Sequence, residues 1–154
     1  MNMPCATATA GNGELTGRRI LLGLTGGVAC YKAAELCRLL VKAGATVQVM
    51  MTEAAGQFIT PVTMQALSGR AVFTSQWDAR SPDNMAHIRL GRETDLILLA
   101  PCSADFAARL AQGRADELVS LTCLARPRGV PLLVARFRRA MAESSQSSTC
   151  CWVS

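Results

Sequence analysis

Three short segments of the sequence combine a hydroxyl group with small residues, a combination that suits the binding of a phosphate. They are residues 25–29 (Thr-Gly-Gly-Val-Ala), 52–55 (Thr-Glu-Ala-Ala) and 100–105 (Ala-Pro-Cys-Ser-Ala-Asp). Glycine lets the backbone approach a phosphate closely, and the N-terminus of a following helix adds free N–H groups and the positive end of the helix dipole. The first segment matches neither the dinucleotide-binding nor the Walker fingerprint. Singly, each segment is equally explained as a tight turn or a helix cap; together they indicate a ligand site.

His87 is the only histidine of the chain. Histidine is the side chain whose ordinary pKa suits proton transfer near neutral pH. Its neighbours, among them Asp83, Arg89 and Arg92, form an ordinary polar sequence. Residue types alone therefore favour a structural role for His87 over a catalytic one.

Seven cysteines are spread irregularly along the chain, without a C-x-x-C pair. The odd number and irregular spacing argue against a disulfide framework, and a zinc site would need more partners than one histidine supplies. We therefore predict no metal site and expect buried free thiols in a reducing cytoplasm.

The three segments follow apolar runs that alternate with helical patterns. Residues 96–100, which are apolar throughout and follow Asp95, form the clearest buried strand. Such strands, alternating with helices, predict a parallel α/β sheet covered on both faces, with its ligand site outside the carboxyl ends of the strands. The expected strands are residues 20–24, 46–51, 71–73, 96–100 and 131–135, and the expected helices are residues 28–43, 61–67, 103–111 and 116–125.

The chain of 154 residues is long enough for one domain with a sizeable core. We expect a disordered extension over residues 1–17, the α/β domain over 18–135, and a tail without apolar periodicity, which we expect to be disordered, over 136–154.

The net charge of +5 belongs mostly to the end of the chain, since residues 1–117 hold 11 basic and 10 acidic side chains whereas residues 118–154 hold 5 and 1. The nearly neutral charge of residues 1–117 and the scarcity of aromatic residues argue against a nucleic-acid partner. No stretch approaches the roughly 18 apolar residues of a membrane span. We expect a cytoplasmic protein without a membrane partner.

Taken in order, these motifs resemble those of the flavin-containing cysteine decarboxylases, in particular the bacterial enzymes that act on phosphopantothenoylcysteine. The order and approximate spacing agree over about three quarters of the chain. The matching segments are residues 24–32 (LTGGVACYK), 49–55 (VMMTEAA), 85–90 (MAHIRL), 94–105 (TDLILLAPCSAD), 121–125 (LTCLA) and 131–135 (PLLVA).

The resemblance implies a flavodoxin-like or Rossmann-like doubly wound parallel sheet, with FMN bound between neighbouring subunits of a homotrimer or a multiple of trimers. It implies decarboxylation of 4'-phospho-N-pantothenoylcysteine to 4'-phosphopantetheine in coenzyme A biosynthesis, in which flavin oxidation of the cysteinyl group lets the carboxylate leave. His87 corresponds to the family's catalytic histidine, which reverses the interpretation from residue types alone. The implied cofactor-binding residues are Thr25, Gly26, Gly27, Val28, Thr52, Glu53, Ala54, Ser103, Ala104, Asp105 and Phe106.

The resemblance ends after Ala135. Members of the family carry Pro-Ala-Met-Asn there, with an asparagine that holds the substrate carboxylate, whereas this chain continues Arg-Phe-Arg-Arg and has no asparagine after Asn84. We therefore expect a C-terminally incomplete sheet, and we attribute the sequence from Arg136 onward to an altered reading frame or a truncated gene. Resequencing the locus tests this hypothesis, and an intact frame without a downstream remnant of the motif would contradict it. The alternatives are a lineage-specific tail and, for function, a non-catalytic flavin-binding or regulatory homologue or an inactive gene remnant.

Overall fold

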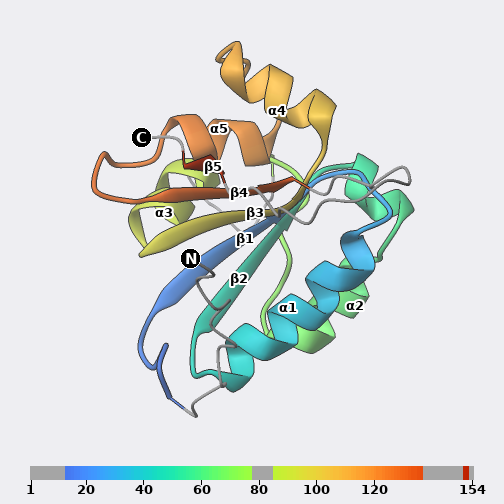
Figure 1. Cartoon of the computed structure of the whole chain (residues 1–154). Coiled ribbons are helices and arrows are strands. Elements are labelled where there is room, and N and C mark those ends of the chain that lie inside the picture. The colour runs from blue at the N-terminus through green and yellow to red at the C-terminus, as the bar shows by residue number, and fades with distance from the viewer. Residues whose placement is uncertain (1–12, 78–84, 137–150, 153–154) are drawn as a thin grey trace, which may run out of the picture.

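The computed structural model describes residues 13–77, 85–136 and 151–152. Among these, one sheet with strand order β2-β1-β3-β4-β5 carries helices on both faces (Figure 1). The strands are β1 (Arg19–Leu24), β2 (Thr46–Met51), β3 (Leu96–Cys102), β4 (Leu132–Arg136) and β5 (Cys151–Trp152). The helices are α1 (Cys30–Lys42), the 3-10 helix η1 (Ala54–Gln57), α2 (Pro61–Ser68), α3 (Ala86–Arg92), α4 (Ala104–Ala111) and α5 (Leu118–Leu124).

Strands β1 to β4 are parallel to one another, which confirms the predicted parallel α/β fold. The chain order of the strands reverses between β1 and β3, so the loops that follow these two strands diverge to opposite faces of the sheet. Open sheets bind ligands beside this reversal, at the carboxyl ends of the strands. The fold therefore places the three hydroxyl-bearing segments together at the carboxyl ends of the strands.

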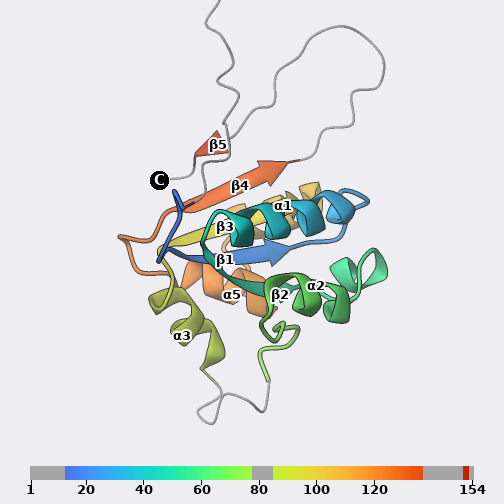
Figure 2. The same ribbon diagram turned by 90° about the horizontal axis from the view of Figure 1, so that it is seen from below.

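Two apolar cores, one on each face of the sheet, hold the layers together. The strands alternate their side chains between the faces, so that Leu22 packs toward α1 and α2 while Leu21 packs toward α3 and α5. Helices α1 and α2 cover one face and α3 and α5 cover the other, as the two views show (Figures 1 and 2). The predicted buried thiols are confirmed for the four cysteines that the structure describes, Cys30, Cys37, Cys102 and Cys123.

The segments at the two ends of the domain show more structure than we expected where the chain is described. Residues 13–17 form a turn. The N–H group of Leu15 in this turn donates to the carbonyl of Ala43, at the end of α1, at 3.1 Å. In the tail, β5 pairs antiparallel with β4 through Leu133 and Trp152. The rest of the two predicted disordered segments, residues 1–12, 137–150 and 153–154, lies outside the described residues.

Several local expectations differ from the structure. The strand expected over residues 71–73 is reduced to a single bridge between Phe73 and Met50. Helix α3 was not predicted, because no side chain caps its N-terminus and it is only seven residues long. Helix α5 begins at Leu118 instead of residue 116, with Glu117 as its N-cap residue.

Candidate functional site

A cavity of about 460 Å³ lies at the carboxyl ends of β1, β2 and β3. Its volume falls within the usual range for small-molecule sites, about 300 to 1,000 Å³. The loops that follow the three strands supply part of its lining, and helix α4 and the residue that precedes α5 supply the rest. The lining residues are Thr25, Gly26, Thr52, Glu53, Ala54, Phe58, Ser103, Asp105, Phe106, Arg109 and Glu117.

The buried Thr25 joins the loop after β1 to the loop after β3. Its hydroxyl group donates to the carbonyl of Pro101 at 2.8 Å and accepts the N–H group of Ser103 at 2.7 Å. A hydroxyl group has one hydrogen to donate, and here it is used within the protein. Thr25 therefore shapes the pocket wall, which differs from our expectation that this hydroxyl group would be offered to a ligand.

Thr52 and Ser103 act as local caps. The Oγ1 atom of Thr52 accepts the N–H group of Ala55 at 3.2 Å, and the Oγ atom of Ser103 accepts the N–H group of Phe106 at 3.1 Å, as predicted for a capping serine. In both contacts the hydroxyl oxygen is the acceptor. Among the described residues neither hydroxyl group donates a hydrogen bond, so each has a hydrogen to offer a ligand in the pocket.

The glycine pair after β1 has two different structural roles. A Cβ atom on Gly26 would lie 2.7 Å from the Cβ atom of Ala54, so the close approach of the first and second loops requires a glycine there. A Cβ atom on Gly27 would meet nothing within 4 Å among the described residues. The first turn of α1, which follows, holds no acidic residue. The loop thus offers open space and an uncancelled helix dipole, as a phosphate requires.

Charged groups surround the opposite side of the pocket. The Nε atom of Arg109 lies 3.0 Å from Oδ2 of Asp105, and its Nη1 atom lies 3.9 Å from Oδ2 of Asp116. Glu117 is half-buried, and its pKa is raised, mainly by burial and further by the nearby Asp116, Asp105 and Glu53, while Arg109 lowers it. This side of the pocket therefore disfavours additional negative charge.

His87 lies in α3, which packs against α5, and is not among the residues that line the cavity. Figures 1 and 2 show α3 on the side of the sheet where the strands begin, whereas the cavity lies where they end. The Nδ1 atom of His87 is buried and has no hydrogen-bond partner among the described residues. A single copy of the chain therefore does not bring His87 to the predicted cofactor loops.

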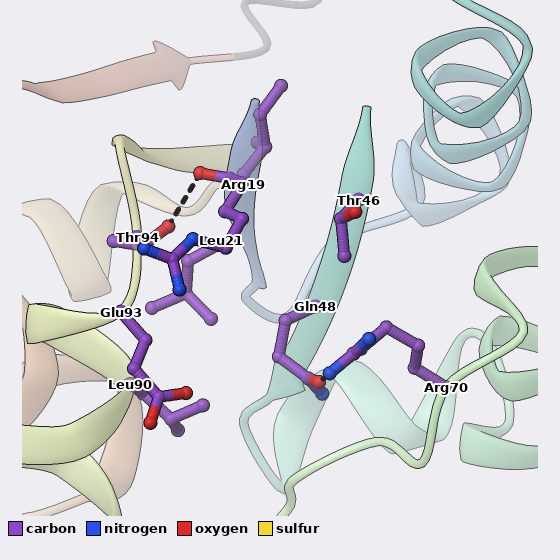
Figure 3. A pocket seen from close by; sticks show the side chains of 9 residues that line it. Arg19, Leu21, Thr46, Gln48, Arg70, Leu90, Glu93 and Thr94 are labelled. Carbon is purple, nitrogen blue, oxygen red and sulfur yellow. Dashed lines mark hydrogen bonds between the residues drawn. The ribbon is translucent and has the colours of Figure 1, made fainter. Parts of the chain in front are cut away.

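A second cavity, of about 50 Å³, lies at the opposite end of the sheet. Figure 3 shows its lining, in which the hydroxyl group of Thr94 donates to the carbonyl of Arg19 at 2.9 Å. The Nε atom of Arg70 donates to Oε1 of Gln48 at 3.1 Å on the other side. This cavity has room for a few waters at most and contains no predicted site residue.

The structure brings most of the predicted cofactor residues into one pocket. Gly27, Val28 and Ala104 belong to the same loops but do not line it. The sequence analysis missed Phe58, Arg109 and Glu117. Of these three residues, only Arg109 could have been found from the sequence, because its spacing from Asp105 is that of an ion pair on one helix face. Within the described residues there is no cluster of potential metal ligands, and none of the helices described is long and apolar enough to span a bilayer.

Known proteins are similar to this chain over most of its length. It is 54% identical over 112 residues to the coenzyme A biosynthesis bifunctional protein CoaBC of Vibrio cholerae, which covers 73% of this chain but only 28% of that protein. It is 45% identical over 118 residues to the probable phosphopantothenoylcysteine decarboxylase of Streptococcus mutans, covering 77% of this chain and 66% of that protein. The chain thus spans less than a third of the length of the bifunctional relative.

Two solved structures of similar fold are decarboxylases. The FMN-dependent cysteine decarboxylase SpaF superposes with a TM-score of 0.73 at 25% identity, over 81% of this chain and 71% of that one. A PPC decarboxylase variant complexed with pantothenoylaminoethenethiol superposes with a TM-score of 0.67 at 27% identity, over 80% of this chain and 69% of that one. The model of the Flavoprotein family matches residues 9–152. With its doubly wound sheet and its pocket at the strand ends, this chain belongs to the Flavoprotein family.

Proposed function

We propose that the chain binds FMN in the pocket at the strand ends and acts as a phosphopantothenoylcysteine decarboxylase. The observation that carries the proposal is the convergence of the three predicted loops on one cavity of about 460 Å³, in a chain whose relatives and structural neighbours are decarboxylases. When bound, the flavin supplies the two-electron redox chemistry that makes the carboxylate of a cysteinyl substrate a leaving group.

The residues of the chain position the cofactor. The open space at Gly27 and the N-terminus of α1 favour the phosphate, and the free hydroxyl hydrogens of Thr52 and Ser103 are available as donors. Asp105 and Glu117 oppose negative charge on the other side. The charges therefore orient an anionic ligand with its phosphate toward the glycine loop.

His87 would transfer a proton during the reaction, and its place in the fold requires an assembly. Because His87 does not line the pocket of its own chain, we propose that it serves the pocket of a neighbouring copy in a homotrimer or a multiple of trimers. The support for this assignment is the match of residues 85–90 (MAHIRL) to the family's motif around its catalytic histidine.

The test is to purify the chain, titrate it with FMN, and measure carbon dioxide release from phosphopantothenoylcysteine. We expect a yellow complex with one FMN per chain and release of carbon dioxide that requires the bound flavin. A soluble, folded protein that binds no FMN would overturn the proposal. The oligomer size, measured by light scattering on the same sample, tests the trimeric assembly.

A second candidate function is flavin binding without turnover. It is favoured by one sequence observation: after β4 the chain reads Arg-Phe-Arg-Arg, and no asparagine follows Asn84. Catalysis depends on a substrate held in one orientation, and the family's carboxylate-binding asparagine has no counterpart here. Bound FMN with no release of carbon dioxide would select this second function.

A further inference from the structure

Nδ1 of His87 is the one buried side-chain nitrogen or oxygen atom without a hydrogen-bond partner among the described residues. Buried polar side-chain atoms are normally paired, so an exception within a residue proposed to transfer a proton has a bearing on its chemistry. The unpaired atom decides which of the two ring nitrogens of His87 carries hydrogen.

The two nitrogens of a neutral imidazole ring have opposite roles. One carries hydrogen and donates a hydrogen bond, and the other presents a lone pair and accepts one. Which nitrogen carries the hydrogen is set by the bonds that the ring makes. A histidine that acts as a base through Nε2 has its Nδ1–H group held by a carboxylate or a carbonyl oxygen, as in Ser-His-Asp triads. For Nε2 of His87 to be free to take up a proton, Nδ1 would need such an acceptor.

The helices around the ring supply no acceptor to Nδ1 among the described residues. Helix α3 has no acidic residue in its first turn, and its other ionisable side chains are the cations Arg89 and Arg92. Helix α5, which packs against α3, contains no carboxylate over residues 118–124 (LVSLTCL). Its two hydroxyl groups, on Ser120 and Thr122, donate to backbone carbonyl groups one turn back, at 2.9 and 2.7 Å. The hydrogens of this helix are therefore also used elsewhere.

The two tautomers of the ring leave different groups unpaired. With the hydrogen on Nδ1, the buried atom is an N–H donor without an acceptor, and buried N–H groups of the backbone are rarely left in that state. With the hydrogen on Nε2, burial leaves only a lone pair unpaired. Nε2 itself is not a buried atom without a partner, so a hydrogen there reaches solvent or a hydrogen-bond partner. The fold therefore favours hydrogen on Nε2.

We propose that the packing of α3 against α5 holds the neutral ring of His87 in the tautomer with hydrogen on Nε2, so that His87 meets its ligand as a hydrogen-bond donor and not as a base. The ionised ring carries hydrogen on both nitrogens, so Nε2 is a donor in that form too. The ligand group that Nε2 meets is then an acceptor, such as a carbonyl, carboxylate or phosphate oxygen. The inference rests on the proposed role of His87 and adds to it an atom and a direction: the hydrogen starts on the histidine.

Nuclear magnetic resonance reads the tautomer directly on the unmodified chain. Because His87 is the only histidine, labelling histidine with ¹⁵N gives a single pair of ring signals. Correlation of the carbon-bound ring hydrogens with the two nitrogens shows which nitrogen carries hydrogen in the neutral ring, at about pH 9. We expect hydrogen on Nε2 and a bare Nδ1, both in the free chain and with FMN added. Hydrogen on Nδ1, or an even mixture of the two tautomers, would overturn the inference.

Two substitutions test the donor role in turnover. The side-chain amide nitrogen of glutamine reaches about as far from the backbone as Nε2, whereas that of asparagine reaches only as far as Nδ1. His87→Gln therefore keeps a donor at the position of Nε2 without a group that titrates, and His87→Asn is its matched control. We expect the kcat for carbon dioxide release to be at least about tenfold higher in His87→Gln than in His87→Asn, with equal FMN binding. Equal kcat values in two folded, flavin-loaded variants would overturn the donor role.

The failure of this inference and the failure of the proposed function give different results. Wild-type turnover together with hydrogen on Nδ1 would overturn the inference and leave the proposed function intact. A chain with hydrogen on Nε2 that binds FMN and releases no carbon dioxide would overturn the proposed turnover, and the donor role with it, while the tautomer stands.

Discussion

The hydroxyl oxygen of Thr25 accepts the backbone N–H group of Ser103 at 2.7 Å across 78 positions of sequence. The same hydroxyl group donates to the carbonyl of Pro101 at 2.8 Å. These two bonds join the ends of β1 and β3 at the point where the strand order reverses. The pocket is therefore built by the protein itself, before a ligand contributes any contact.

Thr25→Val should destabilise the chain by about 2 to 3 kcal/mol while keeping nearly the same shape, because it leaves the N–H group of Ser103 unpaired and removes one of the two bonds to the carbonyl of Pro101, which keeps the N–H group of Thr25. Urea unfolding measures the free energy, and FMN titration measures the accompanying loss of affinity. Thr25→Ser is the control, since it keeps the hydroxyl group and should lose only about 1 kcal/mol for the methyl group. Equal losses in the two variants would show that the hydroxyl group does not hold the loops together.

The two glycines of the first loop should respond differently to alanine. Gly26→Ala places a Cβ atom 2.7 Å from that of Ala54, so it should lower the free energy of unfolding by about 1 to 3 kcal/mol and weaken FMN binding. The added methyl group of Gly27→Ala meets nothing within 4 Å in the part of the chain that the structure describes, so this variant should leave the stability unchanged or slightly raised. If Gly27 contacts the phosphate, its added methyl group should weaken FMN binding about tenfold. Unchanged affinity would remove Gly27 from the cofactor site.

His87→Asn should lower carbon dioxide release by a factor of about 100 to 10,000 and leave FMN bound, because proton transfer is lost while the cofactor loops are untouched. Flavin absorbance and turnover, measured on the same preparation, separate the two effects. Undiminished turnover would refute the catalytic role.

Mixing chains of two kinds tests which pocket His87 serves. His87→Asn chains should have little turnover alone because proton transfer is lost, and Gly26→Ala chains should have reduced turnover at low FMN because cofactor binding is weakened. If His87 acts on a neighbouring pocket, refolding them together creates some sites with an intact loop from one chain and an intact histidine from the other. Recovery of part of the wild-type turnover is therefore expected, and no recovery would place both groups in the same chain's site.

The elements of the fold could be predicted from the sequence wherever the local sequence pattern agrees with burial in the structure. The predicted strand over residues 46–51 is β2 without change, because its apolar and β-branched side chains are suited to a buried parallel strand. Ser103 caps α4 as predicted, since a cap depends on a few adjacent residues. Helix α3 was missed because Met85, at its N-cap position, offers no capping side chain, and its apolar contacts come from α5.

The residues of the pocket could be predicted from the sequence only in part, for a physical reason. Its three loops follow strands, and the strand order of a parallel sheet brings them to one edge. Glu117 reaches the same pocket through the packing of α4 and α5 on the sheet, which no local pattern encodes. The position of His87 likewise depends on how the chain packs. Its proposed catalytic role depends on the assembly of several copies of the chain.

Cys123 provides a pH test of the second core. Burial raises the pKa of its thiol from 9.0 to about 12, with a smaller rise from Cys102 and an opposing effect of Arg126. Between these two values the native chain keeps the proton while the unfolded chain loses it. The unfolded state then binds fewer protons, so the stability contributed by the buried thiol is complete below about pH 9 and is lost as the pH rises toward 12.

The free energy of unfolding of the wild type should therefore fall with pH in this window, with a contribution from Cys123 of up to about 1.4 kcal/mol per pH unit. Burial also raises the pKa of Cys30 and of Cys37, so these thiols add to the wild-type slope. Cys123→Ala removes only its own part, and urea unfolding of both proteins between about pH 8 and pH 11 measures the difference. Parallel pH profiles for the two proteins would mean that the Cys123 thiol ionises in the native state as easily as in the unfolded chain, and that solvent reaches the core between α5 and the sheet.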